Sequence, residues 1–138
     1  MSAAVLIDTS ALFALLDRDD AVHEDAAAGW DRLLEGIADG NFGALTHHGV
    51  VVESSALVQR RLGMSALRDL HYGLLEVIQV VRPDEALHNR AVSAMLAAGR
   101  RGVSLVDWTS FELMRERSVE LALAFDRDFV DQGFTLFR

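Results

Sequence analysis

Short apolar runs alternate with longer amphipathic stretches along the whole sequence, and this alternation limits the fold more than any other feature. Residues 4–7 form the first such run, which suits a buried parallel strand, and a helical period follows it. The repeated order predicts a three-layer α/β/α domain with a central, mostly parallel sheet of about five strands. The expected strands are 4–7, 42–46, 76–81, 103–106, 121–125 and 134–137, and the expected helices are 11–16, 23–38, 48–62, 65–75, 83–98 and 108–117.

Two local signals indicate where the later helices begin. Pro83 precedes an amphipathic stretch, and proline is favoured at the first position of a helix. Thr109 is followed three residues later by Glu112, which matches a capping box. We therefore expect one helix to open at Pro83 and another to begin beside Thr109, just after a strand over 103–106.

Length and composition favour one compact intracellular domain. The 138 residues fit a single domain over residues 1–138, and an apolar fraction of 51% is enough for a core. The chain has no cysteine, which excludes disulfides, thiolate zinc sites and cysteine nucleophiles. Because no signal peptide or membrane-spanning stretch is recognisable, we expect a cytoplasmic protein that does not bind membranes.

The net charge of −8 is unfavourable for a protein that binds nucleic acid, because contacts from basic side chains to phosphates supply most of that affinity. Residues 1–40 contain nine acids and two arginines, a net charge of −7, so the other 98 residues carry only −1. The excess of acid therefore belongs to one segment. All 13 basic residues are arginine, a bias that genome composition explains more readily than RNA binding does.

Four carboxylates are candidates for a common site. Asp8 and Asp126 directly follow apolar strands, and Asp107 follows a third strand-like run that leads into a helix. The carboxyl ends of parallel strands face the crevice in which ligands bind, so these three acids should converge. Glu53 belongs to a helix, on the side shared with Val50, and we expect it to face inward.

A cluster of this kind needs a counter-charge. Bringing three or four carboxylates together is costly unless cations or protons neutralise them, and the chain has no lysine. Hard oxygen ligands suit Mg²⁺ or Mn²⁺. Such an ion lowers the pKa of a bound water and stabilises charge on a phosphodiester, so the cluster predicts metal-dependent hydrolysis of a phosphodiester bond.

Four segments in order resemble the acidic motifs of a PIN-domain nuclease, and the spacing is similar to that of the VapC-type toxins of bacterial toxin–antitoxin pairs. The segments are Ile7–Leu12, the lone Glu53, Ser104–Phe111 and Ala124–Phe129. The resemblance spans the whole chain. It implies an Mg²⁺- or Mn²⁺-dependent endoribonuclease that leaves a 5′-phosphate and a 3′-hydroxyl, is inhibited by a cognate antitoxin protein and forms a homodimer.

The resemblance also assigns roles to individual acids. Asp8, Glu53, Asp107 and Asp126 correspond to the acidic quartet of the family, and Asp128 corresponds to a further acid or histidine that varies within it. We expect Asp8, Asp107 and Asp126 to hold the principal ion. Glu53 and Asp128 would then complete a second metal site or orient the water.

Each acid also has a purely structural interpretation. Asp8 and Asp107 precede or open helices and are residues that favour the N-cap, although Thr9, Ser10 or the box at Thr109 could cap instead. Asp126 and Asp128 are ordinary turn residues. We expect only one of Thr9 and Ser10 to have a function at the site.

Other polar residues carry weaker signals. His47 and His48 adjoin a helix start with no further histidine at ligand spacing, so a structural or exposed role is favoured. Several arginines are candidates for contact with RNA phosphates, and Arg127, between two acids of the proposed site, is the strongest of them. The wider set comprises Arg60, Arg61, Arg100, Arg101, Arg115 and Arg117.

Two alternative functions remain at this point. A phosphatase could use Asp8 as its nucleophile, but Ser10 stands where the usual second acid would be. An inactive PIN-like protein-binding module would retain the fold without the chemistry. The presence of all four acids favours the nuclease over both.

Overall fold

The computed structural model describes residues 2–138, and every strand pairing in its five-stranded sheet is parallel. The strands are β1 (Ala3–Ile7), β2 (Phe42–His47), β3 (Ile78–Val81), β4 (Leu121–Leu123) and β5 (Thr135–Leu136). The helices are α1 (Thr9–Leu16), α2 (His23–Ala38), α3 (His48–Leu62), α4 (Met64–Tyr72), α5 (Glu85–Ala98), α6 (Leu105–Glu116) and α7 (Asp128–Asp131), with the 3₁₀ helix η1 (Leu74–Val77) before β3.

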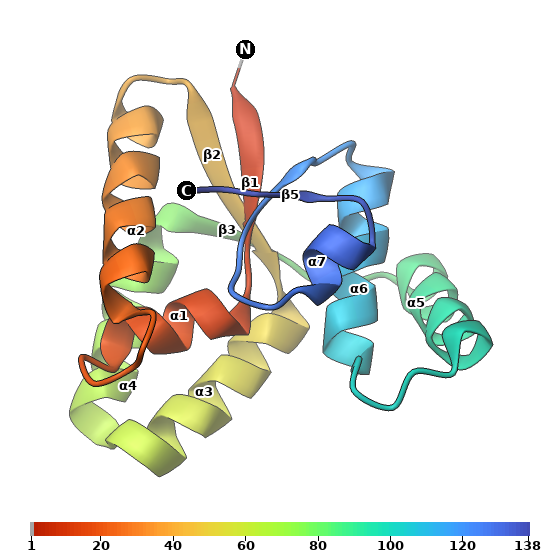
Figure 1. Cartoon of the computed structure of the whole chain (residues 1–138), viewed down its shortest axis with the longest axis horizontal. Coiled ribbons are helices and arrows are strands. Elements are labelled where there is room, and N and C mark those ends of the chain that lie inside the picture. Colours follow the sequence, from red (N-terminus) through yellow and green to blue (C-terminus); the bar gives the residue numbers. More distant parts are fainter. Residues whose placement is uncertain (1) are drawn as a thin grey trace.

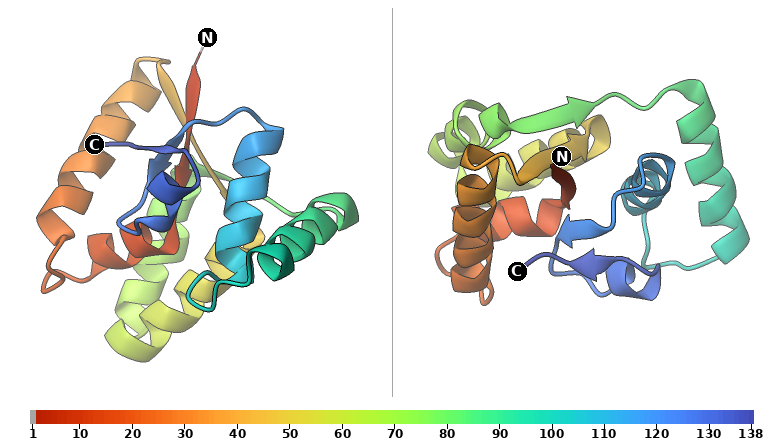
Figure 2. Two further views of the ribbon diagram at one scale, coloured as in Figure 1. Left: turned by 45° about the vertical axis from the view of Figure 1, so that its right-hand side comes forward. Right: turned by 90° about the horizontal axis from the view of Figure 1, so that it is seen from above.

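Helices cover both faces of the sheet, which confirms the predicted three layers (Figure 1). In β1, Val5 and Ile7 pack with buried residues of α1, α2, α3 and α4, whereas Leu6 faces the opposite core with α5 and α6. The view from above in Figure 2 shows these two groups of helices on opposite sides of the strands. A strand buried on both faces has no polar side to expose, which explains the uninterrupted apolar run at residues 4–7.

The strand order is β3-β2-β1-β4-β5. The chain proceeds outward from β1 through β2 to β3, and then returns across the sheet to place β4 on the other side of β1. The strand order therefore reverses between β1 and β4. In open parallel sheets, ligands bind at the carboxyl ends of the strands beside such a reversal.

The strand expected over 103–106 does not exist. Ser104 is the N-cap of α6, and it forms a capping box with Asp107, because each side chain accepts a hydrogen bond from the other residue's backbone N–H. The box predicted at Thr109 and Glu112 is wrong: the Thr109 hydroxyl donates to the Leu105 carbonyl at 2.8 Å, inside the helix. A short apolar run at the half-buried start of a helix looks the same as a strand in the sequence.

The start of α5 also differs from the prediction. Asp84 is the N-cap, and its side chain accepts a hydrogen bond from the Leu87 N–H at 2.8 Å. Pro83 therefore lies one residue before the cap and not at the first helical position. The other end of α5 closes on Gly99, whose φ of 61° lies in the left-handed region that glycine adopts without strain.

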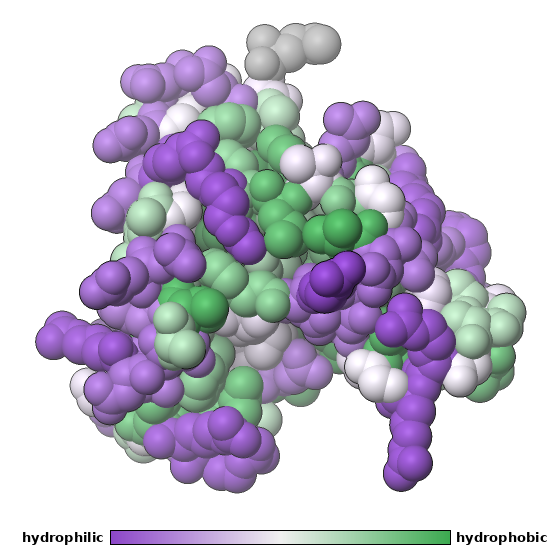
Figure 3. Space-filling view, viewed as in Figure 1, coloured by the Kyte–Doolittle hydropathy of each residue, from purple (hydrophilic) through white to green (hydrophobic). Residues whose placement is uncertain are grey.

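The acidic excess of residues 1–40 lies largely on the outer face of α2. Exposed acids repeat along this helix, while Trp30 and Leu33 pack inward. Figure 3 shows hydrophilic side chains along this edge of the molecule. The exposed acids on and just after α2 are Glu24, Asp25, Asp31, Glu35 and Asp39. Across residues 2–138, the structure contains no helix with the length and apolar character to cross a membrane.

Candidate metal centre

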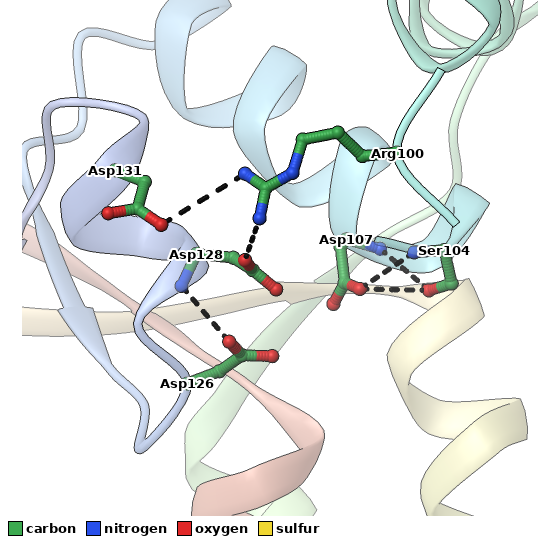
Figure 4. Close-up of polar contacts among 6 residues, drawn as sticks. All are labelled: Arg100, Ser104, Asp107, Asp126, Asp128 and Asp131. Carbon is green, nitrogen blue, oxygen red and sulfur yellow. Dashed lines mark hydrogen bonds and ion pairs between the residues drawn. The ribbon is translucent and has the colours of Figure 1, made fainter. Parts of the chain in front are cut away.

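Three carboxylates meet at the edge of the sheet beside the reversal of strand order. Asp126 comes three residues after β4, Asp128 begins α7, and Asp107 lies in the first turn of α6. One ligand oxygen from each lies within 4.8 Å of the others, the one such group of three metal-ligating side chains found in residues 2–138. Figure 4 shows the three side chains directed into a shared space between α6 and the segment that leads into α7.

Asp8 is buried beside this group, at the end of β1, with only 4% of its surface exposed. It is the N-cap of α1, so the expectation that Thr9 or Ser10 would cap instead is wrong. Its Oδ2 accepts hydrogen bonds from both the N–H and the hydroxyl of Ser10, at 3.2 Å and 2.6 Å. Its Oδ1 accepts no hydrogen bond from residues 2–138, so one carboxylate oxygen caps the helix while the other is free for a ligand.

Ser10 joins two strand ends. Its hydroxyl donates to Asp8 and accepts a hydrogen bond from the backbone N–H of Phe125 at 3.0 Å. Phe125 directly precedes Asp126. The Ser10 hydroxyl therefore links the turn that contains Asp8 to the segment that contains Asp126. Of the two hydroxyl residues after Asp8, Ser10 is thus the one in contact with the acidic site.

In Asp107 and Asp126, as in Asp8, one carboxylate oxygen accepts hydrogen bonds and the other accepts none from the part of the chain that the structure describes. Oδ2 of Asp107 accepts hydrogen bonds from the N–H and hydroxyl of Ser104, at 2.9 Å and 3.1 Å. Oδ1 of Asp126 accepts from the N–H of Asp128 at 3.0 Å. In both carboxylates the second oxygen makes no hydrogen bond within the described chain. The structural interpretation of these acids as cap and turn residues is therefore correct, and it is compatible with ligand binding.

Burial and mutual repulsion disfavour the charged forms of these acids. Burial, together with Asp107 and Asp126, raises the pKa of Asp8 to about 6 against the hydrogen bonds from Ser10. Burial is also the main cause that raises the pKa of Asp107, followed by repulsion from Asp126 and Glu53. The pKa of Asp128 is raised to about 6, first by burial and then by the neighbouring carboxylate of Asp126, which favours the protonated form of Asp128. The site therefore carries more negative charge than its surroundings stabilise.

Glu53 does not face inward as predicted. The buried face of α3 consists of Val50, Ser54 and Val58, and Glu53 lies at the edge of that face with its side chain exposed. It is close enough to Asp107 to raise the pKa of that carboxyl, but it lies outside the group of three acids. The prediction failed because the buried stripe of α3 is narrow. Glu53 lies 60° around the helix axis from Val50, and at that angle its side chain is already outside the stripe.

His47 connects the helices that carry Glu53 and Asp107. Its ring is 1% exposed, and Nδ1 accepts a hydrogen bond from the Gly49 N–H at the start of α3. Nε2 must then carry the proton, and it points to the Val106 carbonyl at 3.1 Å and the Ser110 hydroxyl at 3.0 Å. Burial lowers the pKa of His47 to about 4, so the ring is neutral at physiological pH. The expected structural role is confirmed for this histidine.

The glycine beside His47 is required by close packing. A Cβ added to Gly49 would lie 2.8 Å from Cε1 of the imidazole, closer than such contacts allow. The absence of a side chain at residue 49 therefore lets the ring of His47 cap α3 and still reach α6.

Arg100, which the sequence placed in the wider set of candidates behind Arg127, is the arginine that reaches the acids. It lies in the loop between α5 and α6, with NH2 3.5 Å from Oδ1 of Asp128 and NH1 4.0 Å from Oδ2 of Asp131. Arg127, the favoured candidate, is exposed and forms no ion pair within residues 2–138. The available signal for Arg100 was its place between Gly99 and Gly102, in the loop that leads to Asp107.

Comparison with known proteins agrees with this architecture: the chain belongs to the PIN-domain family, whose sequence model matches residues 5–134. A relative of this chain is the 23S rRNA-specific endonuclease VapC20 of Mycobacterium tuberculosis. It is 31% identical over 135 residues, which cover 97% of this chain and 98% of VapC20. The crystal structure of VapC20, described as a Sarcin-Ricin loop cleaving toxin, matches with a TM-score of 0.81 at 30% identity, covering 95% of this chain and 96% of that one.

Two more distant structures share the fold alone. FitAcB from Neisseria gonorrhoeae has a TM-score of 0.67 at 18% identity and covers 97% of this chain and 96% of its own. VapBC2 from Rickettsia felis, solved with a DNA fragment from its promoter, has a TM-score of 0.71 at 7% identity, with coverages of 98% and 99%. The PIN fold is therefore retained where little sequence identity remains.

Proposed function

We propose that this protein is a metal-dependent endoribonuclease, the toxin of a toxin–antitoxin pair. Its site would consist of Asp8, Glu53, Asp107, Asp126 and Asp128. The observation that carries the proposal is the convergence of Asp107, Asp126 and Asp128, with ligand oxygens within 4.8 Å of one another. The relationship to VapC20 supports the reaction class.

The donor set fits Mg²⁺ or Mn²⁺. Both ions prefer carboxylate oxygens, and ligands on opposite sides of an octahedral Mg²⁺ lie about 4.2 Å apart. A spacing of at most 4.8 Å therefore needs only a small adjustment of exposed or half-buried side chains. A zinc site of the usual structural kind is excluded because the chain has no cysteine, and His47 is committed to α3 and α6.

Each residue of the site would have a distinct task in hydrolysis. A divalent ion supplies positive charge and a water of lowered pKa when bound. Asp107, Asp126 and Asp128 would bind it, and Asp8, which lies outside this group of three but close enough to interact with Asp107 and Asp126, would add its free Oδ1 from the buried end of β1. Ser10 and Ser104 would orient the carboxylates of Asp8 and Asp107. Water would attack the phosphorus, and the bond to the 3′-oxygen would break to leave a 3′-hydroxyl and a 5′-phosphate.

The substrate that we propose first is ribosomal RNA in its sarcin–ricin loop. VapC20 is named for 23S rRNA and described as cleaving this loop, and the chain aligns with nearly all of it. With ribosomal RNA as its substrate, the protein would act in the cytoplasm.

We further propose a cognate antitoxin as the inhibitor and a homodimer as the state of the free toxin. Exposed apolar side chains on α4 support a protein-binding surface, because Met64 and Tyr72 are 49% and 78% exposed. Co-expression with the product of the adjacent gene should give a stable complex without nuclease activity. Light scattering of the purified toxin should give twice the mass of 15.2 kDa.

The test of the function uses the full chain on a synthetic stem-loop RNA that carries the sarcin–ricin loop, and on total cellular RNA. We expect cleavage with Mg²⁺ or Mn²⁺, none with EDTA, and a loss of at least about 100-fold in Asp126→Asn, a larger loss than outer-shell substitutions cause. Asp31→Asn is the matched control, because Asp31 is exposed on the outer face of α2 and carries the same charge.

Three results would contradict the proposal. Cleavage by Asp126→Asn at the rate of the unaltered chain would exclude the acidic group as the active site. Absence of both Mn²⁺ binding by calorimetry and RNA cleavage would favour an inactive binding module. Hydrolysis of a phosphomonoester without RNA cleavage would favour a phosphatase based on Asp8.

A further inference from the structure

Arg100 makes only weak contacts with the acids beside it. Its NH2 group donates to Oδ1 of Asp128 at 3.5 Å, and NH1 is 4.0 Å from Asp131 (Figure 4). Strong pairs between a cationic nitrogen and a carboxylate are about 2.7–2.9 Å long. Half of the Arg100 side chain is exposed, and exposed ion pairs hold a side chain weakly. Arg100 can therefore exchange these partners for another anion.

Most of the hydrogen-bonding capacity of Arg100 is unused. A guanidinium has five N–H donors, and within residues 2–138 that of Arg100 makes one hydrogen bond. Other arginines are more firmly occupied. Arg90 pairs with Glu116 at 2.6 Å, and Arg115 pairs with Glu112 at 2.7 Å and also donates to Gln132. The free donors of Arg100 lie beside the acidic group, whereas the other two arginines are engaged by close neighbours.

An RNA phosphate approaching this site meets mainly negative charge. The surrounding carboxylates repel it, and one divalent ion offsets only part of their charge. Within the described chain, Arg100 is the one basic side chain at ion-pair distance from the three-acid group. Its planar fork also suits two oxygens of one phosphate. The carboxylates around the site are Asp8, Glu53, Asp107, Asp126 and Asp128.

We propose that Arg100 binds a phosphate of the RNA substrate at the acidic site, and that Asp128 and Asp131 hold its guanidinium there before RNA arrives. The inference rests on the proposed nuclease function and adds a residue that contacts the substrate. It also predicts opposite effects on two ligands. Removal of this positive charge should lower kcat/KM for RNA cleavage. The affinity for Mn²⁺ should stay the same or rise, because a cation that repels the metal ion is gone.

The variants are Arg100→Gln, Arg100→Lys and the control Arg101→Gln. Arg101 is the next residue, is exposed and has no ion pair in residues 2–138, so its loss changes the net charge equally. For Arg100→Gln we expect kcat/KM for the stem-loop RNA to fall about 10–100-fold, the range for a lost hydrogen bond to a charged group. Arg100→Lys should recover part of the activity, because it restores the charge without the fork.

Salt dependence gives a second readout. Each phosphate contact contributes about 0.7–0.9 to the slope of log affinity against log salt concentration, so Arg100→Gln should reduce that slope by about one contact. Calorimetric titration with Mn²⁺ alone, in the absence of RNA, measures the metal site separately. Thermal melting checks that all three variants fold.

The outcomes separate this inference from the proposed function. Unchanged kcat/KM and salt slope in Arg100→Gln would contradict the inference alone, provided that the unaltered chain cuts the RNA. If Arg100→Gln lost Mn²⁺ affinity together with activity, Arg100 would only position Asp128. If kcat/KM fell equally in Arg101→Gln, the effect would be one of net charge. Both results overturn the phosphate contact. Failure of the unaltered chain to bind Mn²⁺ and cut RNA would overturn the function and the inference together.

Discussion

Asp8 and Asp128 have similarly raised pKa values near 6, but the chain holds them in different ways. Asp8 ends a central strand, is almost fully buried, and accepts two hydrogen bonds from Ser10. Asp128 begins a helix of four residues, and its side chain contacts the exposed Arg100. The inner carboxylate is thus positioned by the core of the fold, whereas the outer one depends on a surface loop and can adjust to a ligand.

The largest expected effect separates these two acids directly. Under the proposed function, Asp8→Asn should reduce cleavage by at least about 100-fold, because it removes a negative charge beside the metal site. The same change should raise the free energy of unfolding of the metal-free protein by about 2–3 kcal/mol at pH 7, since a pKa raised by about two units makes the buried charge unfavourable. The amide oxygen can still accept both hydrogen bonds from Ser10.

Asp128→Asn is the matched outer variant. It should reduce cleavage only about tenfold and change the free energy of unfolding by less than about 1 kcal/mol, because relief of the repulsion from Asp126 is offset by loss of the ion pair with Arg100. Urea unfolding in EDTA and RNA cleavage with Mn²⁺ measure the two quantities. A loss of stability in Asp8→Asn would show that the charge of Asp8 is well stabilised, and the comparison would fail.

The next effect concerns the serines that hold the carboxylates. Ser10→Ala removes the hydroxyl that joins Asp8 to the Phe125 N–H, so we expect Mn²⁺ affinity to fall about 10–100-fold and stability by about 1–3 kcal/mol. Ser104→Ala breaks a cap within one helix and should lower stability by about 1 kcal/mol, with a smaller effect on Mn²⁺. Calorimetry on both variants measures this order. A larger loss of Mn²⁺ affinity in Ser104→Ala would contradict it.

The smallest effect on cleavage is expected at His47, and it depends on pH. The pKa of this ring is lowered from 6.5 to about 4 in the folded protein, so the unfolded chain binds a proton first as the pH falls. The contribution of His47 is complete above pH 6.5 and is lost between pH 6.5 and 4, by about 3 kcal/mol in total. His47→Asn, which can keep the cap of α3, should show a flatter dependence of stability on pH over this range.

The control for His47→Asn is His71→Asn, since His71 is exposed and its hydrogen bond to Ser55 lies at the surface. Urea unfolding at intervals between pH 4 and 7 measures both variants against the unaltered chain. An unchanged pH dependence in His47→Asn would mean that the buried ring does not limit stability in acid.

Much of the fold followed from the sequence because both faces of the sheet are buried. A run such as residues 4–7 has no polar alternation, so the sequence indicated a covered parallel strand, and Asp8 at its end was found correctly. The same reasoning failed at residues 103–106, where Leu105 and Val106 begin a buried helix. Ser104 and Asp107 already had the three-residue spacing of a capping box in the sequence, with Asp in place of Glu.

The parts of the site that could not be predicted depend on tertiary position. Periodicity placed Glu53 near Val50, but only the packing of α3 determines how narrow the buried stripe is. Arg127 was favoured for its place between two acids in the sequence, whereas Arg100 approaches them from a loop 28 residues before Asp128. Cap and ligand are not exclusive roles, because a carboxylate has two oxygens and Asp8 caps α1 with only one of them.

The hydrogen bond from Phe125 to Ser10 spans 115 residues and has a consequence for the order in which the protein is made. β1 leaves the ribosome well before its neighbour β4 and the acids that follow β4. The acidic site therefore cannot assemble until the chain has been synthesised past Asp128. Under the proposed function, a nascent chain that has not reached this point is harmless to the ribosome that is translating it, and destructive chemistry begins only after it.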